Sequence, residues 1–242
     1  MAKVKTSQRL LQAALECFAE KGYYATTVEE ICNRANANIA AVNYHFGDKH
    51  RLYERVWEYA CELAERDYPL ELPDHLESAR AGVTHFVRNM LKQIFDDTPS
   101  GSFPRLMFQE LSLPSPILPQ LLERHLLQRR KLLFQLLRNW LREKGLDEES
   151  KPCLLDLLHY SIVSQVVMIN IHRRAMRRAT AMDHELRQQM EALMARTEGI
   201  ENQWMLRELS TEKSEQVVTV LVDHIVGMVE AYLEKLKEGR AR

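Results

Sequence analysis

Apolar residues recur along most of this chain every three or four positions, the period of a helix buried on one face. The first run places Leu15 and Phe18 on one face. It can be capped at Thr6 or Ser7, and it stops at Gly22, which adopts a left-handed conformation at low cost. No segment alternates apolar and polar residues over a useful strand length. The pattern therefore predicts an all-α protein.

Two short helices are predicted next, joined by a tight turn. Thr27 and Glu30 have the spacing of a capping box at the start of the first helix. Asn36 suits the turn, because Asn tolerates the left-handed conformation. Asn38 suits the N-cap of the second helix, which spans 39–46. Two short helices in this order indicate a helix-turn-helix, whose second helix can enter the DNA major groove.

A small three-helix core would hold this N-terminal unit together. Its predicted apolar members are Leu15, Phe18, Val28, Ile31, Ile39, Val42 and Phe46. Gly47 ends the second short helix, and Asp48 caps a fourth helix that continues toward Pro69. We predict a helix-turn-helix domain over 1–56 and a larger helical domain over 57–242.

The larger domain shows the same helical period. Helices are predicted over 78–95, 104–113, 117–144, from 147 to about 178, and from 210 or 211 to about 237. The segment 179–209 is helical by propensity but has a poorer apolar stripe. It could be an added helical arm or a mobile charged excursion.

Composition narrows the class of protein. With 242 residues, 45% hydrophobic and 28% charged, the chain is typical of a soluble globular protein. Its net charge of −1 means that any contact with nucleic acid must be local. We find no secretory signal and no run of about 18 apolar residues, so we expect a cytoplasmic protein with no membrane span. The four cysteines lack paired spacing, which favours reduced, buried thiols.

Catalytic and metal-binding motifs are missing from the sequence. There is no H-E-x-x-H, no G-x-S-x-G, no phosphate-binding glycine loop and no pair of histidines four positions apart. We therefore predict no enzyme, no cofactor and no metal. A helical adaptor that binds proteins without DNA is the alternative to a regulator.

Three elements within residues 7–53 are distinctive when read together: Ala13-Ala14-Leu15-x-x-Phe18-x-x-x-Gly22, Thr26-Thr27-Val28-x-x-Ile31, and Tyr44-His45-Phe46-Gly47-Asp48-Lys49-x-x-Leu52-Tyr53. This segment resembles the DNA-binding domain of the TetR (tetracycline-repressor) family of bacterial regulators. The run 161–172 and the helix from residue 116 are similar to the CecR-like branch. The resemblance implies a repressor that binds palindromic double-stranded operator DNA as a homodimer and is released by a small-molecule effector. It places the dimer contact on the helix from residue 147 and on the last helix.

Carried over by position, the resemblance assigns phosphate contacts to Thr27, Tyr44, His45 and Lys49. Base reading would fall to Asn38, Ile39, Ala40, Ala41 and Asn43. Family members often have Gly at positions 36 and 40, a small hydroxyl residue at 41 and an aromatic residue at 43, and this chain departs from all four. Asn43 could pair with adenine, although it could also be solvated or bind a phosphate.

The resemblance also implies an effector pocket lined by residues of the long helices. The candidates are Phe86, Met90, Phe103, Met107, Phe108, Phe134, His159, Gln165, Met168 and His172. Phe and Met suit an adaptable apolar pocket, but at helical spacing they more often belong to an ordinary core.

Overall fold

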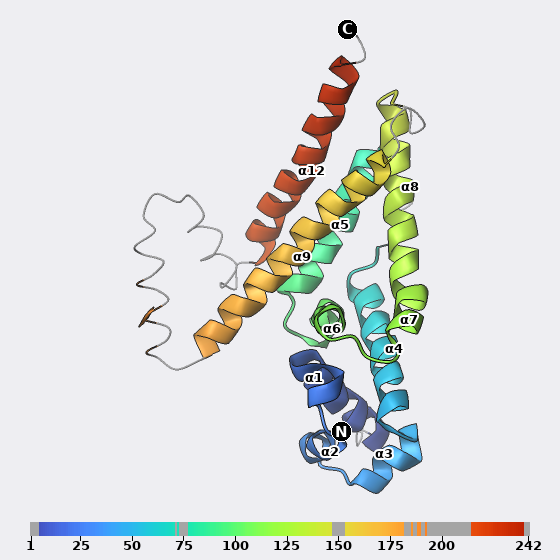
Figure 1. Ribbon diagram of the computed structural model, residues 1–242, viewed down its shortest axis with the longest axis vertical. Helices are drawn as coiled ribbons and strands as arrows, with labels where there is room; N and C mark the ends of the chain where they lie inside the picture. Colours follow the sequence, from blue (N-terminus) through green and yellow to red (C-terminus); the bar gives the residue numbers. More distant parts are fainter. Residues whose placement is uncertain are drawn as a thin grey trace. The chain divides into compact units, whose positions relative to one another are not determined.

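The structure is a computed structural model, and every regular element that it describes is helical (Figure 1). The predicted all-α fold is thus confirmed. The described residues are 5–70, 72, 77–146, 153–181, 185, 188–189, 192 and 214–239. Most of the segment 179–209, for which two interpretations were open, lies outside them. The chain divides into two compact units, Met1–Asp74 with Lys92–Gln135, and His75–Leu91 with Leu136–Arg242.

The first unit contains the predicted helix-turn-helix and several later helices. Its elements are α1 (Thr6–Ala25), α2 (Val28–Ala35), α3 (Ile39–Phe46), α4 (Lys49–Asp67), the 3₁₀ turn η1 (Pro99–Gly101), α6 (Ser102–Ser112), α7 (Leu118–Leu121), the π-helical turn η2 (Leu122–Leu126) and the first half of α8 (Leu127–Glu143). The predicted domain boundary after residue 56 falls inside α4 and remains a prediction.

The predicted caps of α2, α3 and α4 are present, because each depends on a few neighbouring residues. The side chains of Thr27, Asn38 and Asp48 accept hydrogen bonds from the backbone N–H groups three residues later, at 3.1, 2.9 and 2.8 Å. Asn36 adopts the left-handed conformation with φ 47° and ψ 57°. Helix α1 differs, since it begins at Thr6 and has Lys5 as an N-cap without a side-chain hydrogen bond. The cap predicted at Thr6 or Ser7 is therefore wrong.

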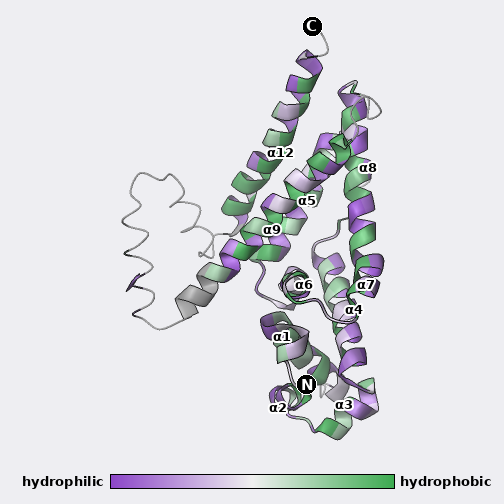
Figure 2. Ribbon diagram, viewed as in Figure 1, coloured by the Kyte–Doolittle hydropathy of each residue, from purple (hydrophilic) through white to green (hydrophobic). Residues whose placement is uncertain are grey.

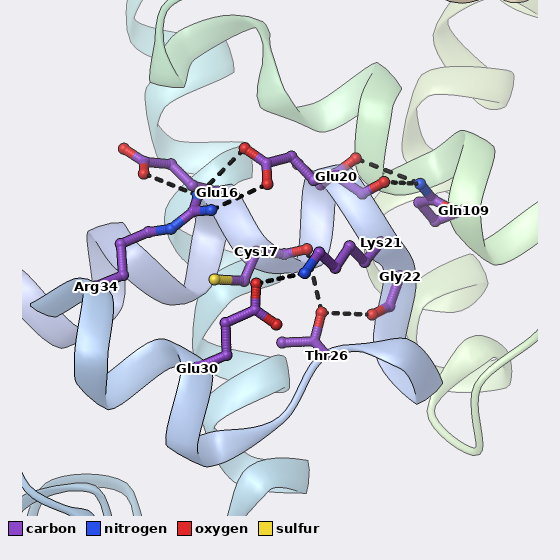
Figure 3. Close-up of polar contacts among 10 residues, drawn as sticks. Glu16, Cys17, Glu20, Lys21, Gly22, Thr26, Glu30, Arg34 and Gln109 are labelled. Carbon is purple, nitrogen blue, oxygen red and sulfur yellow. Dashed lines mark hydrogen bonds and ion pairs between the residues drawn. The ribbon is translucent and has the colours of Figure 1, made fainter. Parts of the chain in front are cut away.

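Helix α1 is kinked at Gly22 rather than ended there. Gly22 has φ 78° and ψ −179°, and one more turn carries the helix to Ala25. The buried Thr26 hydroxyl lies 2.8 Å from the Gly22 carbonyl oxygen and 3.1 Å from that of Cys17, so it satisfies backbone acceptors at the kink (Figure 3).

One predicted member of the three-helix core is wrong. Ile39 is 52% exposed, because it is the first residue of α3 and lies on the outer face of that helix. Leu15, Phe18, Ile31 and Val42 are buried as predicted. The remaining two members, Val28 and Phe46, are partly buried against this core.

Helix α6 joins the N-terminal helices to the rest of the first unit. The Gln109 side-chain amide donates to the Glu20 carbonyl at 2.8 Å, at the end of α1 (Figure 3). The buried Glu110 carboxylate accepts from the Tyr53 hydroxyl of α4 at 2.5 Å and from the Ser115 N–H at 3.0 Å. These contacts hold α1, α4 and α6 in one compact body.

The second unit is a bundle of long helices. It consists of most of α5 (Ala79–Phe95), the second half of α8, α9 (Leu154–Ala181) and α12 (Ser214–Glu238). Arg80 forms an ion pair with Glu230 at 2.8 Å and so links α5 to α12. The Ala79 N–H donates to Glu143 at 2.8 Å and links α5 to α8.

Two described helices pass a test for membrane spans by length and composition, although the sequence predicted no span. They are Leu154–Ala175 and Glu215–Glu238. In the most apolar 18-residue stretch of each helix, 39% and 44% respectively is buried. A core helix of a soluble protein has the same length and composition, so this is weak evidence for a membrane.

The cysteines are all free in the described part of the chain, and three of them follow the prediction of buried thiols. Cys17, Cys32 and Cys61 are buried, whereas Cys153 is exposed. Burial raises the pKa of the Cys61 thiol to about 12, so this group stays protonated at neutral pH.

Candidate nucleic-acid interface

The outer face of α3 is exposed to solvent. The Asn38 cap fixes the start of this helix, and Gly47, with φ 85°, ends it. Val42 is the one residue of α3 that is fully buried. Tyr44 is 85% exposed, a large value for an aromatic side chain. The short helix thus presents most of its side chains to solvent.

The five residues predicted to read bases occupy this helix and its cap, with different freedom to do so. Ile39, Ala40 and Asn43 are exposed. Ala41 is half-buried and packs partly against the core. Asn38 uses its side-chain oxygen for the cap, so its amide N–H groups are what it can offer outward.

The four residues predicted to contact phosphates are also held differently. The rings of Tyr44 and His45 meet edge to face at 4.9 Å, and both residues are exposed. Thr27 is exposed, and its oxygen accepts the cap hydrogen bond while its hydroxyl proton can still be donated. Lys49 is half-buried, with its ammonium group 4.5 Å from the centroid of the Tyr23 ring. Burial lowers the pKa of the Lys49 ammonium group.

The start of α1 lies beside α3 and was missed by the sequence reasoning. An open hollow of about 500 Å³ is lined by Thr6, Arg9, Asn36, Ala37, Asn38, Ala40, Ala41, Tyr44 and His45. Arg9 donates to the Ala35 carbonyl at 3.2 Å and thereby satisfies an acceptor at the end of α2. The polar residues of the first turn of α1 could have indicated that this turn belongs to the interface. Its proximity to α3, however, depends on the fold.

Ion pairs also connect α2 to α1 (Figure 3). Arg34 of α2 binds Glu20 at 3.1 Å and Glu16 at 3.3 Å, both on α1. The hydrogen bond with Glu20 is the main reason why the pKa of Arg34 is raised. Lys21 binds Glu30 at 2.6 Å, so the Glu30 side chain does not complete the capping box. Each exposed ion pair adds little stability alone, but together they form a network that orients α2 relative to α1.

The predicted effector-pocket residues fall into two groups, one in each unit. Phe103, Met107, Phe108 and Phe134 belong to the first unit, where Phe103 is buried and the others are half-buried. The second unit contains Phe86, Met90, His159, Gln165, Met168 and His172. Of these, Phe86 is buried, whereas Met168 and His172 are exposed on α9 and do not lie in an enclosed apolar site within this chain.

No metal centre is visible in the part of the chain that the structure describes. Within it, no group of three or more His, Cys, Asp or Glu side chains is placed to hold a metal ion.

Two models of known protein families match this chain. The model of the family described as bacterial regulatory proteins, tetR family, matches residues 10–56. A second model, the C-terminal domain of the HTH-type transcriptional dual regulator CecR, matches residues 79–201, about half of the chain. The chain therefore belongs to the TetR family of bacterial regulatory proteins, with a second domain of the CecR type.

Curated relatives are transcriptional regulators. The probable regulator YttP of Bacillus subtilis is 26% identical over 141 residues, which cover 56% of this chain and 64% of YttP. CecR of Shigella flexneri is 33% identical over 104 residues, 38% of this chain and 46% of CecR. The chain thus matches less than two thirds of the length of these relatives.

Solved structures share the fold over most of the chain. The Clostridium perfringens putative fatty acid metabolism regulator has a TM-score of 0.60 at 14% identity and covers 90% of this chain and 97% of its own. PfmR of Thermus thermophilus has a TM-score of 0.57 at 17% identity, with 93% and 97% covered. The predicted arrangement of a helix-turn-helix domain and a larger helical domain is confirmed at the level of the fold.

Proposed function

We propose that this protein is a cytoplasmic repressor of transcription that binds a palindromic operator as a homodimer and is released by a small-molecule effector. The exposed outer face of α3 carries the proposal, because it presents Tyr44 and His45 beside a polar hollow that includes Arg9. Hydroxyl, imidazole and guanidinium groups are suited to phosphate oxygens. The name of a relative, the probable acrEF/envCD operon repressor of Escherichia coli, supports the repressor role; it is 35% identical over 62 residues.

On this proposal the exposed surface has two parts with different tasks. Thr27, Tyr44 and His45 bind phosphates directly. Lys49, whose ammonium group packs over the Tyr23 ring, contributes through its charge near the start of α4. Phosphate contacts set affinity and register, but they do not select a sequence. Sequence selection falls to the residues that face the groove, namely Asn38, Ile39, Ala40, Ala41 and Asn43.

Exposed apolar side chains on the second unit support the homodimer. On α9, Leu157, Tyr160 and Met168 are 58%, 71% and 50% exposed, and their spacing places them on one face. On α12, Val220, Met228 and Tyr232 are 47%, 47% and 42% exposed. Figure 2 shows extended hydrophobic segments on both helices. A second copy covering these faces would bury surface that a monomer leaves in water.

A gel-shift titration with the DNA upstream of the gene that encodes the chain tests the DNA-binding proposal. We expect Tyr44→Phe to weaken binding to all fragments and to reduce the dependence of affinity on salt, because one backbone contact is lost. Tyr59→Phe is the matched control, since it removes the same hydroxyl from a half-buried position on α4. Failure of the folded, unmodified chain to bind any fragment at low salt would contradict the proposal and would favour the adaptor.

The base-reading assignment has its own test. Asn43→Ala should change the preferred base at one position in each half-site, by about 1–3 kcal/mol if the amide pairs with adenine. Binding-site selection from randomised operators measures this preference. Equal weakening on every sequence would show that Asn43 reads no base.

A further inference from the structure

Arg129 is a cation held against an aromatic ring in the first unit. Its guanidinium carbon lies 3.9 Å from the centroid of the Phe103 ring. In the described part of the chain Arg129 forms no ion pair within 4.0 Å. The carboxylate whose charge acts on Arg129 is Glu65, which lies beyond ion-pair distance and is exposed to solvent. Burial lowers the pKa of Arg129, although the guanidinium stays charged at neutral pH.

Phe103 belongs to a row of side chains that continues from Arg129. Trp57 of α4, which is fully buried, meets the Phe103 ring edge to face at 5.7 Å. Trp57 also stacks on His125 at 6.5 Å between ring centroids, with the rings 17° from parallel. We call Arg129, Phe103, Trp57 and His125 the arginine–aromatic cluster. It brings together side chains of α4, α6, η2 and α8, all within the first unit.

The cluster contains a second polar group without a full partner. The buried indole N–H of Trp57 has no acceptor with hydrogen-bond geometry. Its effect on the Tyr53 hydroxyl opposes the rise in the pKa of that group, but it has no acceptor there with hydrogen-bond geometry. An orphaned buried donor is rare in folded proteins, and water or a ligand group is one way to complete it.

A π-helical turn shapes the chain at this point. The sequence predicted one continuous helix over 117–144, but the structure has η2 between α7 and α8. Such single π-turns are uncommon and occur frequently at functional sites. Here the turn contains His125 and directly precedes the α8 segment with Arg129, so both side chains reach the aromatic rings of neighbouring helices.

We propose that the arginine–aromatic cluster binds the carboxylate of a small organic acid with an apolar body. Arg129 would hold the carboxylate through its planar N–H groups, a geometry that suits both oxygens at once. Phe103 and Trp57 would contact the apolar body, and His125 would offer a further N–H. The proposal rests on the repressor function proposed above and names the chemical class of its effector. Helix α4 carries Trp57 and follows α3 directly. A ligand bound at this cluster would therefore act on α4 and, through it, on the position of α3.

Isothermal titration calorimetry on the full chain tests this with two matched pairs of probes, benzoate against benzamide and octanoate against octanamide. At least one acid should bind roughly tenfold more tightly than its amide, and Arg129→Met should remove that advantage. Arg130→Met is the matched control, since it deletes an exposed charge one position along the same helix. It should leave the affinity for the acid within about twofold.

A second measurement separates binding from packing. Met keeps apolar contact with Phe103 and removes a desolvated charge, so Arg129→Met should melt at the same temperature as the unmodified chain or higher. The proposal is overturned if neither acid binds, if acid and amide bind equally, or if Arg129→Met binds the acid as well as before. A lower melting temperature together with unchanged affinity would assign Arg129 to packing alone.

Gel shifts without any acid keep the two proposals apart. If the chain binds no DNA but binds an acid through Arg129, the regulator proposal fails and the carboxylate site stands. If it binds DNA but neither acid, the carboxylate site fails alone.

Discussion

Glu110 shows how one buried carboxylate can connect three segments of a helical protein. Its side chain is 1% exposed and accepts hydrogen bonds from the Tyr53 hydroxyl and the Ser115 backbone. Burial first, and the bond to Glu110 second, raise the pKa of Tyr53 far above its ordinary range. The hydroxyl is therefore a permanent donor, and α4 is tied to the end of α6.

Removal of this donor should be costly. Tyr53→Phe leaves one oxygen of a buried acid without its partner, so we expect the free energy of unfolding to fall by about 1.5–3 kcal/mol. Urea unfolding followed by circular dichroism measures the change, with Tyr59→Phe as the control. An unchanged midpoint would mean that water replaces the lost hydroxyl.

Residues whose role depends on near neighbours were predictable from the sequence. The caps at Thr27, Asn38 and Asp48 follow from interactions over three positions, and all are present. The cluster around Arg129 was not predicted, because its members approach one another only after α4, α6 and α8 have packed. Sequence reasoning found Phe103 as a pocket candidate and missed the cation beside it.

At the scale of elements, the junction between α3 and α4 depends on two residues, Gly47 and Asp48. Gly47 takes the positive φ that ends α3, and Asp48 caps α4 by accepting from the Arg51 N–H. Helix α3 and helix α4, which carries Trp57, are thus separated by a single turn.

Loss of this cap should loosen the start of α4. Asp48→Ala should lower the free energy of unfolding by about 1 kcal/mol, whereas Asp48→Asn, which retains a side-chain acceptor, should cost much less. Thermal unfolding of the two variants gives the comparison. Equal losses in both would show that the charge of Asp48, rather than its acceptor, stabilises α4.

Most helix boundaries were predicted to within a few residues. The helix predicted from residue 147, however, begins at Leu154, and the interruption at η2 was not predicted. The period of apolar residues continues across 117–144, and a single wide turn leaves no mark on that pattern. Its presence depends on what the flanking turns pack against, which the sequence alone does not state.

At the scale of the whole molecule, the exposed apolar faces of α9 and α12 predict self-association. Tyr160→Glu should shift the chain from dimer toward monomer, since it would place a charge within the proposed contact. Sedimentation velocity over a range of concentrations measures the shift. Leu113→Glu, at a similarly exposed apolar position of the first unit, is the control and should leave the dimer intact.

Stability should also depend on pH through His125. Burial, and after it the charge of Arg129, lower the pKa of His125 below 6.5. The unfolded chain therefore takes up this proton more readily than the folded chain, and the free energy of unfolding should fall as the pH drops below about 6.5. Urea midpoints at pH 7.5 and 5.5 measure the decline. His125→Gln should reduce it, and His50→Gln serves as the control; a decline of the same size in both variants would contradict the role of His125.

Gln109 has a consequence for how such regulators diverge. It binds main-chain carbonyl groups of α1, which are present whatever side chains stand at positions 19 and 20. What the junction requires is a glycine at 22, whose positive φ and lack of a side chain leave room for the Gln109 amide. Substitutions on the exposed face of α3 can therefore accumulate without disturbing the contact between α1 and α6. We therefore expect helix-turn-helix segments from relatives that retain this glycine to be exchangeable onto the same α6 without loss of this contact.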